Sequence, residues 1–498
     1  MIMNTYIALT IGPITRVISL AKTTRGMWAA SYLFSYMAKL IIEPFKGRTF
    51  LLPYLETDLF STKFDGAGVF PDRYIFKEED GDFDKLASNV EKVIENLAIQ
   101  IAPQDKDTAK KMLMQYFKFY FFQTEKKEGE EDKSLVKRCE QQLALLEQQD
   151  SFIPSIPHGK HYLSRLINSK KLAPMQFLLN DAGIKKFQSI VEISTGEDGD
   201  YSIIPQKPYQ RYIAIVSTDG DSMGKAFSET DDSRKLSQQL LKFNKDAIAA
   251  INQFDGQPVY IGGDDLFFFA PVYNPGKGSI FTLLESIDKA FHEAIGVDCP
   301  ATLSFGVSIT YYKYPMYEAV QLSQNLLAKA KGNYPPEDIK VLKNNVLFSI
   351  QKHSGQTRSG LLHKGCIESV KEMNTFIEKY ISTGDNDDLL LVNSVMHNLR
   401  EHEPILLNAI KDENMLKWYF KNNYNEPSHS TFKSFFDDTS NFLSISYNEL
   451  KGKTDSLKRS LETPIIGRLT GHDAAYAALD LCYASLQFIH LINSKTDE

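Results

Sequence analysis

The hydrophobic and polar positions of this chain follow two periods, and the change from one to the other divides the sequence. Short apolar runs typical of strands alternate with helical stripes over residues 1–125 and again over 207–352. Residues 126–206 are more polar and mostly helical in pattern, and from 353 to 498 the strand signals stop while helical stripes continue. The pattern predicts an α+β protein with two mixed domains, a helical connecting module and a C-terminal helical bundle.

The second mixed region shows its elements most clearly. A strand over 211–220 ends in a polar turn, an amphipathic helix covers 235–254, and "PVYIGGDDLFFFAP" at 258–271 predicts a hairpin. We expect a helix over 279–295, a strand over 301–312, a helix over 314–331 and a strand over 344–351. The order βαββαβ predicts a ferredoxin-like palm.

The first mixed region is less regular. "TYIALTIGP" at 5–13 is typical of a strand, and one long helical pattern runs from residue 17 to residue 42. Shorter strand signals, a second helical pattern and the strand-like "YFKFYFFQTE" at 116–125 follow. These features predict a layered unit of helices and strands.

Composition and charge indicate which classes of protein the chain can belong to. The chain of 498 residues is 43% hydrophobic and 24% charged, and it contains no run of 18 uninterrupted apolar residues and no basic segment before its first apolar run. We therefore expect a cytoplasmic protein with no membrane partner. Its net charge of -7 argues against a free-standing nucleic-acid binder. The cysteines lie far apart in sequence, which predicts buried reduced thiols: Cys139, Cys299, Cys366 and Cys482.

Three aspartates are the candidate catalytic and metal-binding residues. In a palm, the end of the first strand lies beside the turn of the central hairpin, so Asp219 should converge with Asp264 and Asp265. Clustered carboxylates repel one another unless a cation joins them. Oxygen-only ligands favour Mg²⁺ or Mn²⁺, and such ions activate hydroxyl groups and neutralise leaving pyrophosphate.

Residues around these aspartates are candidates for holding a nucleotide. The stretch "TDGDSMGKAF" turns after Asp219 into a predicted helix that begins near residue 222, and small residues there allow close approach of a triphosphate. A lysine one helix after the hairpin is a further candidate phosphate contact. The predicted nucleotide-binding residues are Gly220, Asp221, Ser222, Gly224, Gly262, Gly263 and Lys329.

Each of these signals has a simpler interpretation. Glycine and aspartate are common turn formers, so "GGDD" alone is compatible with an exposed hairpin turn, and Lys329 alone with a solvated lysine. The metal-site interpretation rests on "DGD" and "GGDD" occurring at the two adjacent positions of one βαββαβ unit.

Four segments in this order carry a family resemblance: "TDGDSMG", "YIGGDDLFFFAP", "LSFGVSI" and "LAKAK". Together they resemble the catalytic palm of the large subunit of type III CRISPR effector complexes, which is related to GGDEF and nucleotidyl-cyclase domains. The N-terminal segment over 7–41 and "FPDRYIF" at 70–76 resemble the first palm of the type III-B form. With the helical C-terminal region, the resemblance covers most of the chain.

The resemblance implies a function. It implies two palms that meet across an ATP pocket and that, once target RNA binds, make a nucleotide second messenger with release of pyrophosphate. The product is a cyclic oligoadenylate or an adduct of ATP with S-adenosylmethionine. By resemblance Asp219 and Asp265 are the principal metal ligands and Asp264 an adjacent one. The first palm lacks an aspartate at its strand end in "LTIGPIT", so we expect it to bind a nucleotide without metal.

The resemblance also implies partners. They are the other subunits of a type III-B effector complex, with guide RNA and target RNA held mainly through that complex. Because the first palm begins within ten residues of Met1, we expect no N-terminal HD nuclease domain and no cleavage of DNA. Two other interpretations stay open: a catalytically silent scaffold subunit of the same complex, and an enzyme similar to diguanylate cyclases.

Overall fold

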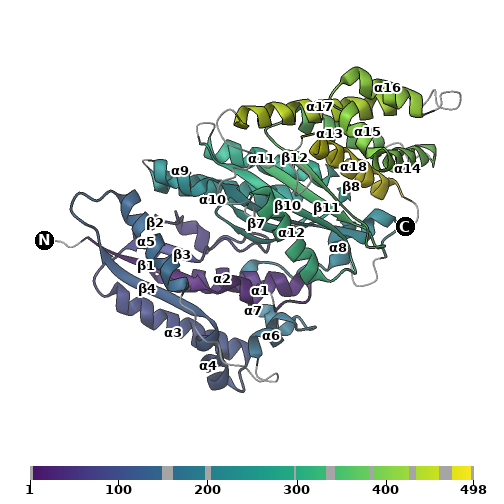
Figure 1. Ribbon diagram of the computed structural model, residues 1–498. Coiled ribbons are helices and arrows are strands. Elements are labelled where there is room, and N and C mark those ends of the chain that lie inside the picture. The colour runs from purple at the N-terminus through teal and green to yellow at the C-terminus, as the bar shows by residue number, and fades with distance from the viewer. Residues whose placement is uncertain are drawn as a thin grey trace.

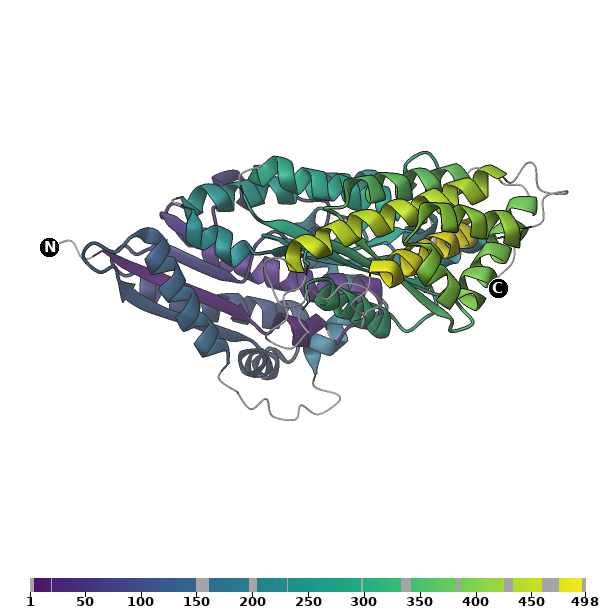
Figure 2. The same ribbon diagram turned by 45° about the horizontal axis from the view of Figure 1, so that its top comes forward.

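The structure is a computed structural model, shown in two views in Figures 1 and 2. It describes residues 4–18, 20–148, 161–196, 204–230, 232–296, 299–332, 342–381, 386–424, 433–458 and 474–494. All structural statements below concern these residues.

The first mixed region folds as a βαββαβ unit with an antiparallel sheet in the order β2-β3-β1-β4. Its strands are β1 (Thr5–Gly12), β2 (Phe50–Leu52), β3 (Arg73–Lys77) and β4 (Lys118–Glu125). Its helices are α1 (Ile14–Ile18), α2 (Thr24–Ile42), α3 (Asp82–Ile101) and α4 (Lys106–Tyr116), with the short 3-10 helices η1 (Glu43–Phe45) and η2 (Thr57–Phe60). We call this unit the first palm.

The single helix predicted over 17–42 is wrong in one respect, because it is interrupted before residue 24. Thr23 has an extended backbone, and its side chain accepts a hydrogen bond from the backbone N–H of Gly26, which starts α2 as a separate helix. Gly26 also lets α2 pack closely on the connecting module, since a Cβ there would lie 2.9 Å from the carbonyl oxygen of Ile167.

The second mixed region contains the predicted ferredoxin-like palm, here called the second palm. Its six-stranded sheet has the order β12-β11-β10-β5-β7-β6. The strands are β5 (Tyr212–Asp221), β6 (Gln257–Gly262), β7 (Asp265–Pro271), β10 (Thr302–Tyr311), β11 (Asn345–Gln351) and β12 (Thr357–His363), and the short pair β8 (Tyr273–Asn274) and β9 (Gly278–Ser279) lies outside the sheet. The helices are α9 (Met223–Glu229), α10 (Ser233–Gln253), α11 (Ile280–Ile295) and α12 (Met316–Ala330), and η5 (Pro208–Arg211) precedes β5. The sequence pattern predicted that this mixed region ends at residue 352, but the sheet continues beyond it with β12.

Helices make up the remaining two parts. The connecting module contains α5 (Asp132–Glu147), α6 (Tyr162–Ile167), η4 (Ala173–Met175), α7 (Gln176–Ala182) and α8 (Ile190–Thr195). The C-terminal bundle contains α13 (Ile367–Ile381), α14 (Asn386–Glu401), α15 (Glu403–Ala409), α16 (Glu413–Asn423), α17 (Lys433–Lys458) and α18 (Ala474–Asn493). The bundle lies at the end of the molecule away from the first palm (Figure 1). The α+β fold class expected from the sequence is confirmed.

The two palms are packed against each other. Lys245 on α10 forms an ion pair of 2.6 Å with Glu56 in the first palm, and the hydroxyl of Ser237 accepts a 2.7 Å hydrogen bond from the backbone N–H of Tyr54. One hydrophobic core runs through both palms and the bundle. It positions the sheet ends of the second palm beside the first palm.

The structure bears on two expectations from the sequence, one about membrane-spanning segments and one about the cysteines. Helix α18 is long and apolar enough to span a membrane, but 83% of its most apolar window is buried inside the protein, which is also typical of a core helix. All four cysteines are free. Cys139, Cys366 and Cys482 are buried as expected, while Cys299 is half-buried.

Candidate active site

The acidic hairpin turn lies beside the end of β5. Thr218 on β5 pairs with Leu266 on β7, and Gly262 pairs with Asp265 across the hairpin, which leaves Gly263 and Asp264 as a two-residue turn. Gly263 has φ of +65°, a conformation that glycine adopts without strain and that such tight turns require.

Gly220 permits direct contact between the strand end and the turn. A Cβ atom at Gly220 would lie 2.4 Å from Oδ2 of Asp264 and 2.5 Å from Cγ of Met223, distances that no side chain tolerates. The carboxylate of Asp264 therefore packs on the backbone of residue 220. Gly262 is similarly enclosed, because a Cβ there would lie 2.5 Å from the hydroxyl of Tyr260.

Asn244 on α10 binds the backbone of the acidic hairpin turn through its side-chain amide. When its amide is oriented to suit its neighbours, its nitrogen donates to the carbonyl oxygen of Gly263 at 2.7 Å, and its oxygen accepts from the N–H of Gly263 at 3.0 Å. Asn244 is buried, and a buried amide that makes two such bonds fixes the backbone it contacts. The only sequence signal for it is a polar residue within the apolar stripe of an amphipathic helix.

The three predicted aspartates influence one another electrostatically. Asp265 is exposed on one side, yet desolvation by the protein atoms around it, followed by the negative charges of Asp264 and Asp219, raises its pKa to about 8. Burial and then the charge of Asp219 also raise the pKa of Asp264, while the nearby ammonium of Lys331 opposes both increases. The carboxylates form one coupled group of like charge.

Lys331 provides the positive charge within this group. It follows the last residue of α12, and its Nζ contacts the carboxylate of Asp219 and donates to the carbonyl oxygen of Gly220 at 2.9 Å. The sequence prediction named Lys329 instead. Lys329 is exposed on α12, and no ion pair or hydrogen bond of its side chain is found in the described part of the chain.

Asp221 departs from its predicted role as a nucleotide contact. It is only 2% exposed, and its Oδ2 accepts hydrogen bonds from the hydroxyls of Thr302 and Ser304 at 2.9 and 2.7 Å and from the N–H of Asn344 at 2.8 Å. These bonds tie the end of β5 to β10 and to the start of β11. The structure therefore places Asp221 in a buried anchoring network rather than on an accessible surface.

Two of the other residues predicted to hold a nucleotide, Ser222 and Gly224, are exposed to solvent. Ser222 and Gly224 are exposed at the start of α9, and a Cβ at Gly224 would meet no atom within 4 Å. Gly224 is therefore not needed for packing in the protein alone.

Two residues near the acidic turn were not included in the sequence prediction: Tyr260 of the second palm and Asp72 of the first palm. Burial raises the pKa of Tyr260 well above its usual value, and the negative charges of Asp72, Asp265 and Asp264 add to the effect. Asp72 belongs to the first palm, and its own pKa is raised, chiefly by burial. Tyr260 thus lies in a negative field that comes from both palms.

The donor set fits a divalent cation. Asp219, Asp264 and Asp265 supply carboxylate oxygens and Gly220 supplies a carbonyl oxygen, which are the hard ligands that Mg²⁺ and Mn²⁺ prefer. The fit is one of donor chemistry, because no group of three or more His, Cys, Asp or Glu side chains among the described residues is positioned to hold a metal ion.

Comparisons with known proteins agree with this architecture. The family described as Cas10/Cmr2, second palm domain, matches residues 212–338, and the N-terminal family of the CRISPR-associated protein Cmr2 matches residues 6–118. The CRISPR system Cmr subunit Cmr2 of Pyrococcus furiosus is 26% identical over 157 residues, which cover 26% of this chain and 18% of that subunit. The match thus spans less than a fifth of the length of this relative.

Solved structures share the fold over nearly the whole chain. A Csm1–Csm4 cassette in complex with pppApA has a TM-score of 0.53 at 14% identity, covering 98% of this chain and 69% of that chain. The apo state of a type III-B Cmr-beta complex has a TM-score of 0.52 at 10% identity, covering 98% and 81%.

The fold and the acidic hairpin define a double-palm protein whose second palm is of the nucleotidyl-cyclase-like class. Both palm matches occur in the same order along the chain as the two sheets described above. The two domain matches and the shared fold support a type III Cas10 large subunit, in agreement with the sequence resemblance.

Proposed function

We propose that this chain is the nucleotidyltransferase subunit of a type III-B CRISPR effector complex and makes a second messenger from ATP. The observation that carries the proposal is the convergence of Asp219, Asp264 and Asp265 where the two palms meet, with Asp264 packed directly on Gly220. A hairpin turn without a chemical role has no reason to bring three like charges together, since their mutual repulsion is unfavourable.

In the proposed reaction, a hydroxyl oxygen of the acceptor nucleotide forms a bond to the α-phosphorus of ATP. The bond from that phosphorus to the bridging oxygen breaks, pyrophosphate leaves, and the hydroxyl proton passes to solvent. When Mg²⁺ or Mn²⁺ is bound, it assists deprotonation of the hydroxyl and neutralises the leaving group. Asp219, Asp264 and Asp265 hold that ion, and Asn244 keeps the turn in place for it.

The first palm is proposed to hold the acceptor. The acceptor is a second ATP, which leads to cyclic oligoadenylate, or S-adenosylmethionine, which leads to a mixed adduct. Related structures support nucleotides as ligands, because Csm1–Csm4 cassettes with this fold were solved with AMPPNP, ATP, cA3 and cA4. The exposed residues Ser222, Gly224 and Lys329 are proposed to face the triphosphate of ATP.

Activation is proposed to depend on the assembled complex. Guide RNA and target RNA are held mainly by partner subunits, because a chain of net charge -7 attracts polyanions poorly by itself. The isolated chain is therefore expected to synthesise little product, and the RNA-bound complex much more. A cytoplasmic location stays a prediction.

The test compares two double variants in the assembled complex with ATP, Mg²⁺ and target RNA. Asp264→Asn with Asp265→Asn is expected to lower pyrophosphate release by at least about 100-fold, which is typical when metal-holding groups are lost. Glu91→Gln with Glu128→Gln removes two exposed carboxylates elsewhere and is expected to retain full activity. Undiminished release in the aspartate variant would reject this site.

Product analysis separates the remaining interpretations. Mass spectrometry of reactions with ATP, with and without S-adenosylmethionine, distinguishes a cyclic oligoadenylate from a mixed adduct. A wild-type complex that releases no pyrophosphate under any of these conditions would favour the silent scaffold. If the isolated chain converted GTP into a cyclic dinucleotide without RNA, the diguanylate-cyclase interpretation would replace the proposal.

A further inference from the structure

A cavity lies at the other end of the second palm from the acidic hairpin. It has a volume of about 620 Å³, and its walls come from the loop before α2, the connecting module and the loop after β10. The acidic site lies at the start of β10, where Ser304 pairs with Asp219, while Tyr312 follows the last residue of this strand. Ser304 and Tyr312 are eight residues apart along this extended strand, which separates the two sites by about 26 Å.

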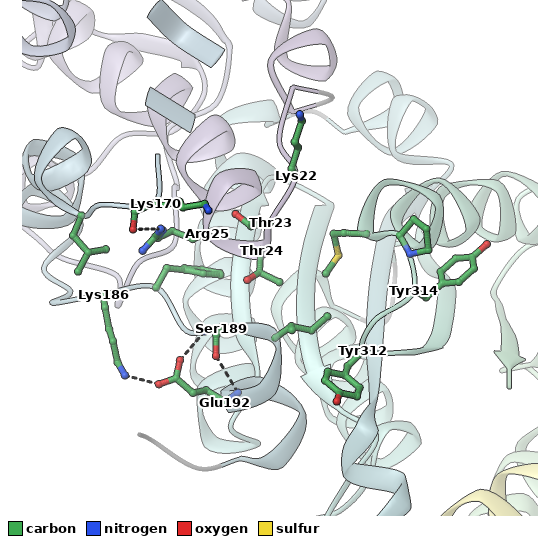
Figure 3. A pocket seen from close by; sticks show the side chains of 15 residues that line it. Lys22, Thr23, Thr24, Arg25, Lys170, Lys186, Ser189, Glu192, Tyr312 and Tyr314 are labelled. Atoms are coloured by element: carbon green, nitrogen blue, oxygen red, sulfur yellow. Dashed lines mark hydrogen bonds and ion pairs between the residues drawn. The ribbon is translucent and has the colours of Figure 1, made fainter. Parts of the chain in front are cut away.

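Three cations line this cavity without a carboxylate partner. Lys22 and Lys170 are exposed, and no ion pair of either is found among the described residues. Arg25 donates from Nη2 to the backbone carbonyl oxygens of Ser169 and Lys170 at 2.8 and 3.2 Å, so it is held in place by neutral groups and keeps its full charge. Figure 3 shows Arg25 and Lys170 close together on one wall.

Among the described residues that line the cavity, the one carboxylate is already engaged. Glu192 pairs with Lys186 at 2.5 Å and also accepts a 2.7 Å hydrogen bond from the backbone N–H of Ser189 in the capping box of α8 (Figure 3). The described lining therefore carries a net positive charge, in a chain whose net charge is -7. Such a site attracts an anion.

The remaining lining is aromatic and apolar. Tyr312 and Tyr314 form the wall opposite Arg25 and Lys170 (Figure 3). Phe187 also lines the cavity and stacks on Trp28 at a centroid distance of 5.5 Å. The remaining apolar lining residues are Leu172, Ile190, Pro315 and Met316. A ligand that contacts both the cationic wall and the aromatic wall carries a phosphate on one side and a flat apolar group on the other.

The walls are preformed. The side-chain oxygen of Asn168 accepts a hydrogen bond from the N–H of Lys22 at 3.0 Å, and its nitrogen donates to the carbonyl oxygen of Leu20 at 2.8 Å. These bonds fix the loop before α2 on the connecting module. The volume lies within the range of about 300–1,000 Å³ that is usual for small-molecule sites.

We propose that this cavity binds a nucleotide unit, with its phosphate at Lys22, Arg25 and Lys170 and its base against Tyr312 and Tyr314. The unit comes from a free nucleotide or from a single-stranded RNA, since both present the same phosphate and base. Binding needs no metal, because the cations are side chains. The inference concerns a site remote from the acidic hairpin and does not depend on nucleotide synthesis.

The test measures binding by the full-length chain in EDTA, with Asp264→Asn and Asp265→Asn present so that the acidic site does not contribute. Fluorescence anisotropy is followed with labelled ATP and, separately, with a labelled single-stranded RNA of eight nucleotides. Lys22→Gln with Lys170→Gln is expected to weaken binding of the favoured probe at least about tenfold at low salt. Lys92→Gln with Lys111→Gln, which removes two exposed charges from α3 and α4, is expected to leave binding unchanged.

Substitutions of Tyr312 distinguish the contribution of base stacking to binding from the contribution of charge. Tyr312→Ala is expected to weaken binding several-fold, and Tyr312→Phe to retain it, because stacking needs the ring rather than the hydroxyl. Tighter binding of ATP identifies a free nucleotide as the source, and tighter binding of the oligonucleotide identifies RNA. Binding of neither probe, or equal weakening by the two lysine pairs, would overturn the proposal.

Discussion

The ammonium group of Lys331 contacts the carboxylate of Asp219 and also donates to the carbonyl oxygen of Gly220 at 2.9 Å. Both oxygens belong to the donor set that suits a divalent cation. The lysine thus balances part of the carboxylate charge in the protein alone. A metal ion at Asp219 competes with this contact.

Replacing Lys331 is therefore expected to change metal binding. Lys331→Met removes the competing cation, so the affinity for Mn²⁺ without nucleotide is expected to rise, by roughly tenfold if the contact is worth about 1.4 kcal/mol. Titration calorimetry of the full chain measures it. Lys329→Met, on the same helix but exposed, is the control and is expected to leave metal affinity unchanged. An affinity that falls in Lys331→Met would show that the lysine supports metal binding instead.

Two neighbouring glycines are expected to respond differently to alanine. Gly220→Ala places a Cβ 2.4 Å from Oδ2 of Asp264, so the turn must shift, with an expected loss of about 1–3 kcal/mol in the free energy of unfolding. Gly224→Ala meets open space within a helix and is expected to leave stability unchanged or slightly higher. Denaturant unfolding in EDTA compares the two. Equal stabilities would contradict the close packing of Asp264 on residue 220.

The raised pKa of Asp265 predicts a pH dependence of stability. The unfolded carboxyl loses its proton near pH 4, whereas the folded one keeps it to about pH 8, so the folded state binds more protons between these values. Stability is therefore expected to fall as pH rises through this window and to level off above it. Melting temperatures in EDTA from about pH 5 to about pH 9 are compared with those of Asp265→Asn, which is expected to show a shallower decline. Parallel curves for the two proteins would count against the shift.

Asn244 is expected to be needed for the position of the acidic turn. Asn244→Ala leaves both backbone groups of Gly263 without their partner, with an expected cost of about 1–3 kcal/mol in stability. Synthesis by the assembled complex is expected to fall more than stability explains, because the turn relaxes. Asn252→Ala, on the same helix and with a 3.5 Å contact to Asp65, is the matched control. Full synthesis in Asn244→Ala would mean that the hairpin holds its own geometry.

Local patterns in the sequence were sufficient to predict the second palm. A continuous apolar run marked β5, and apolar residues alternating with small or polar ones marked β10. The glycine pair marked the hairpin turn before Asp265, and all these features depend on neighbours in sequence. The roles of individual side chains depend on contacts between elements and were harder to predict. Lys329 and Lys331 differ by two positions, about half a helical turn, and only the packing of α12 on the sheet selects Lys331. The burial of Asp221 likewise depends on Ser304, which is distant in sequence.

The continuous hydrophobic core extends from Trp28 in the first palm through Val259 beside the acidic hairpin to Phe488 in the last helix. Close-packed side chains of this kind settle into discrete arrangements rather than deforming gradually. The two palms therefore do not behave as bodies on a loose hinge, because they share this core with the bundle. A packing defect in the bundle therefore weakens the same core that supports the sheet carrying the aspartates, so the stability of the bundle and that of the palms are linked.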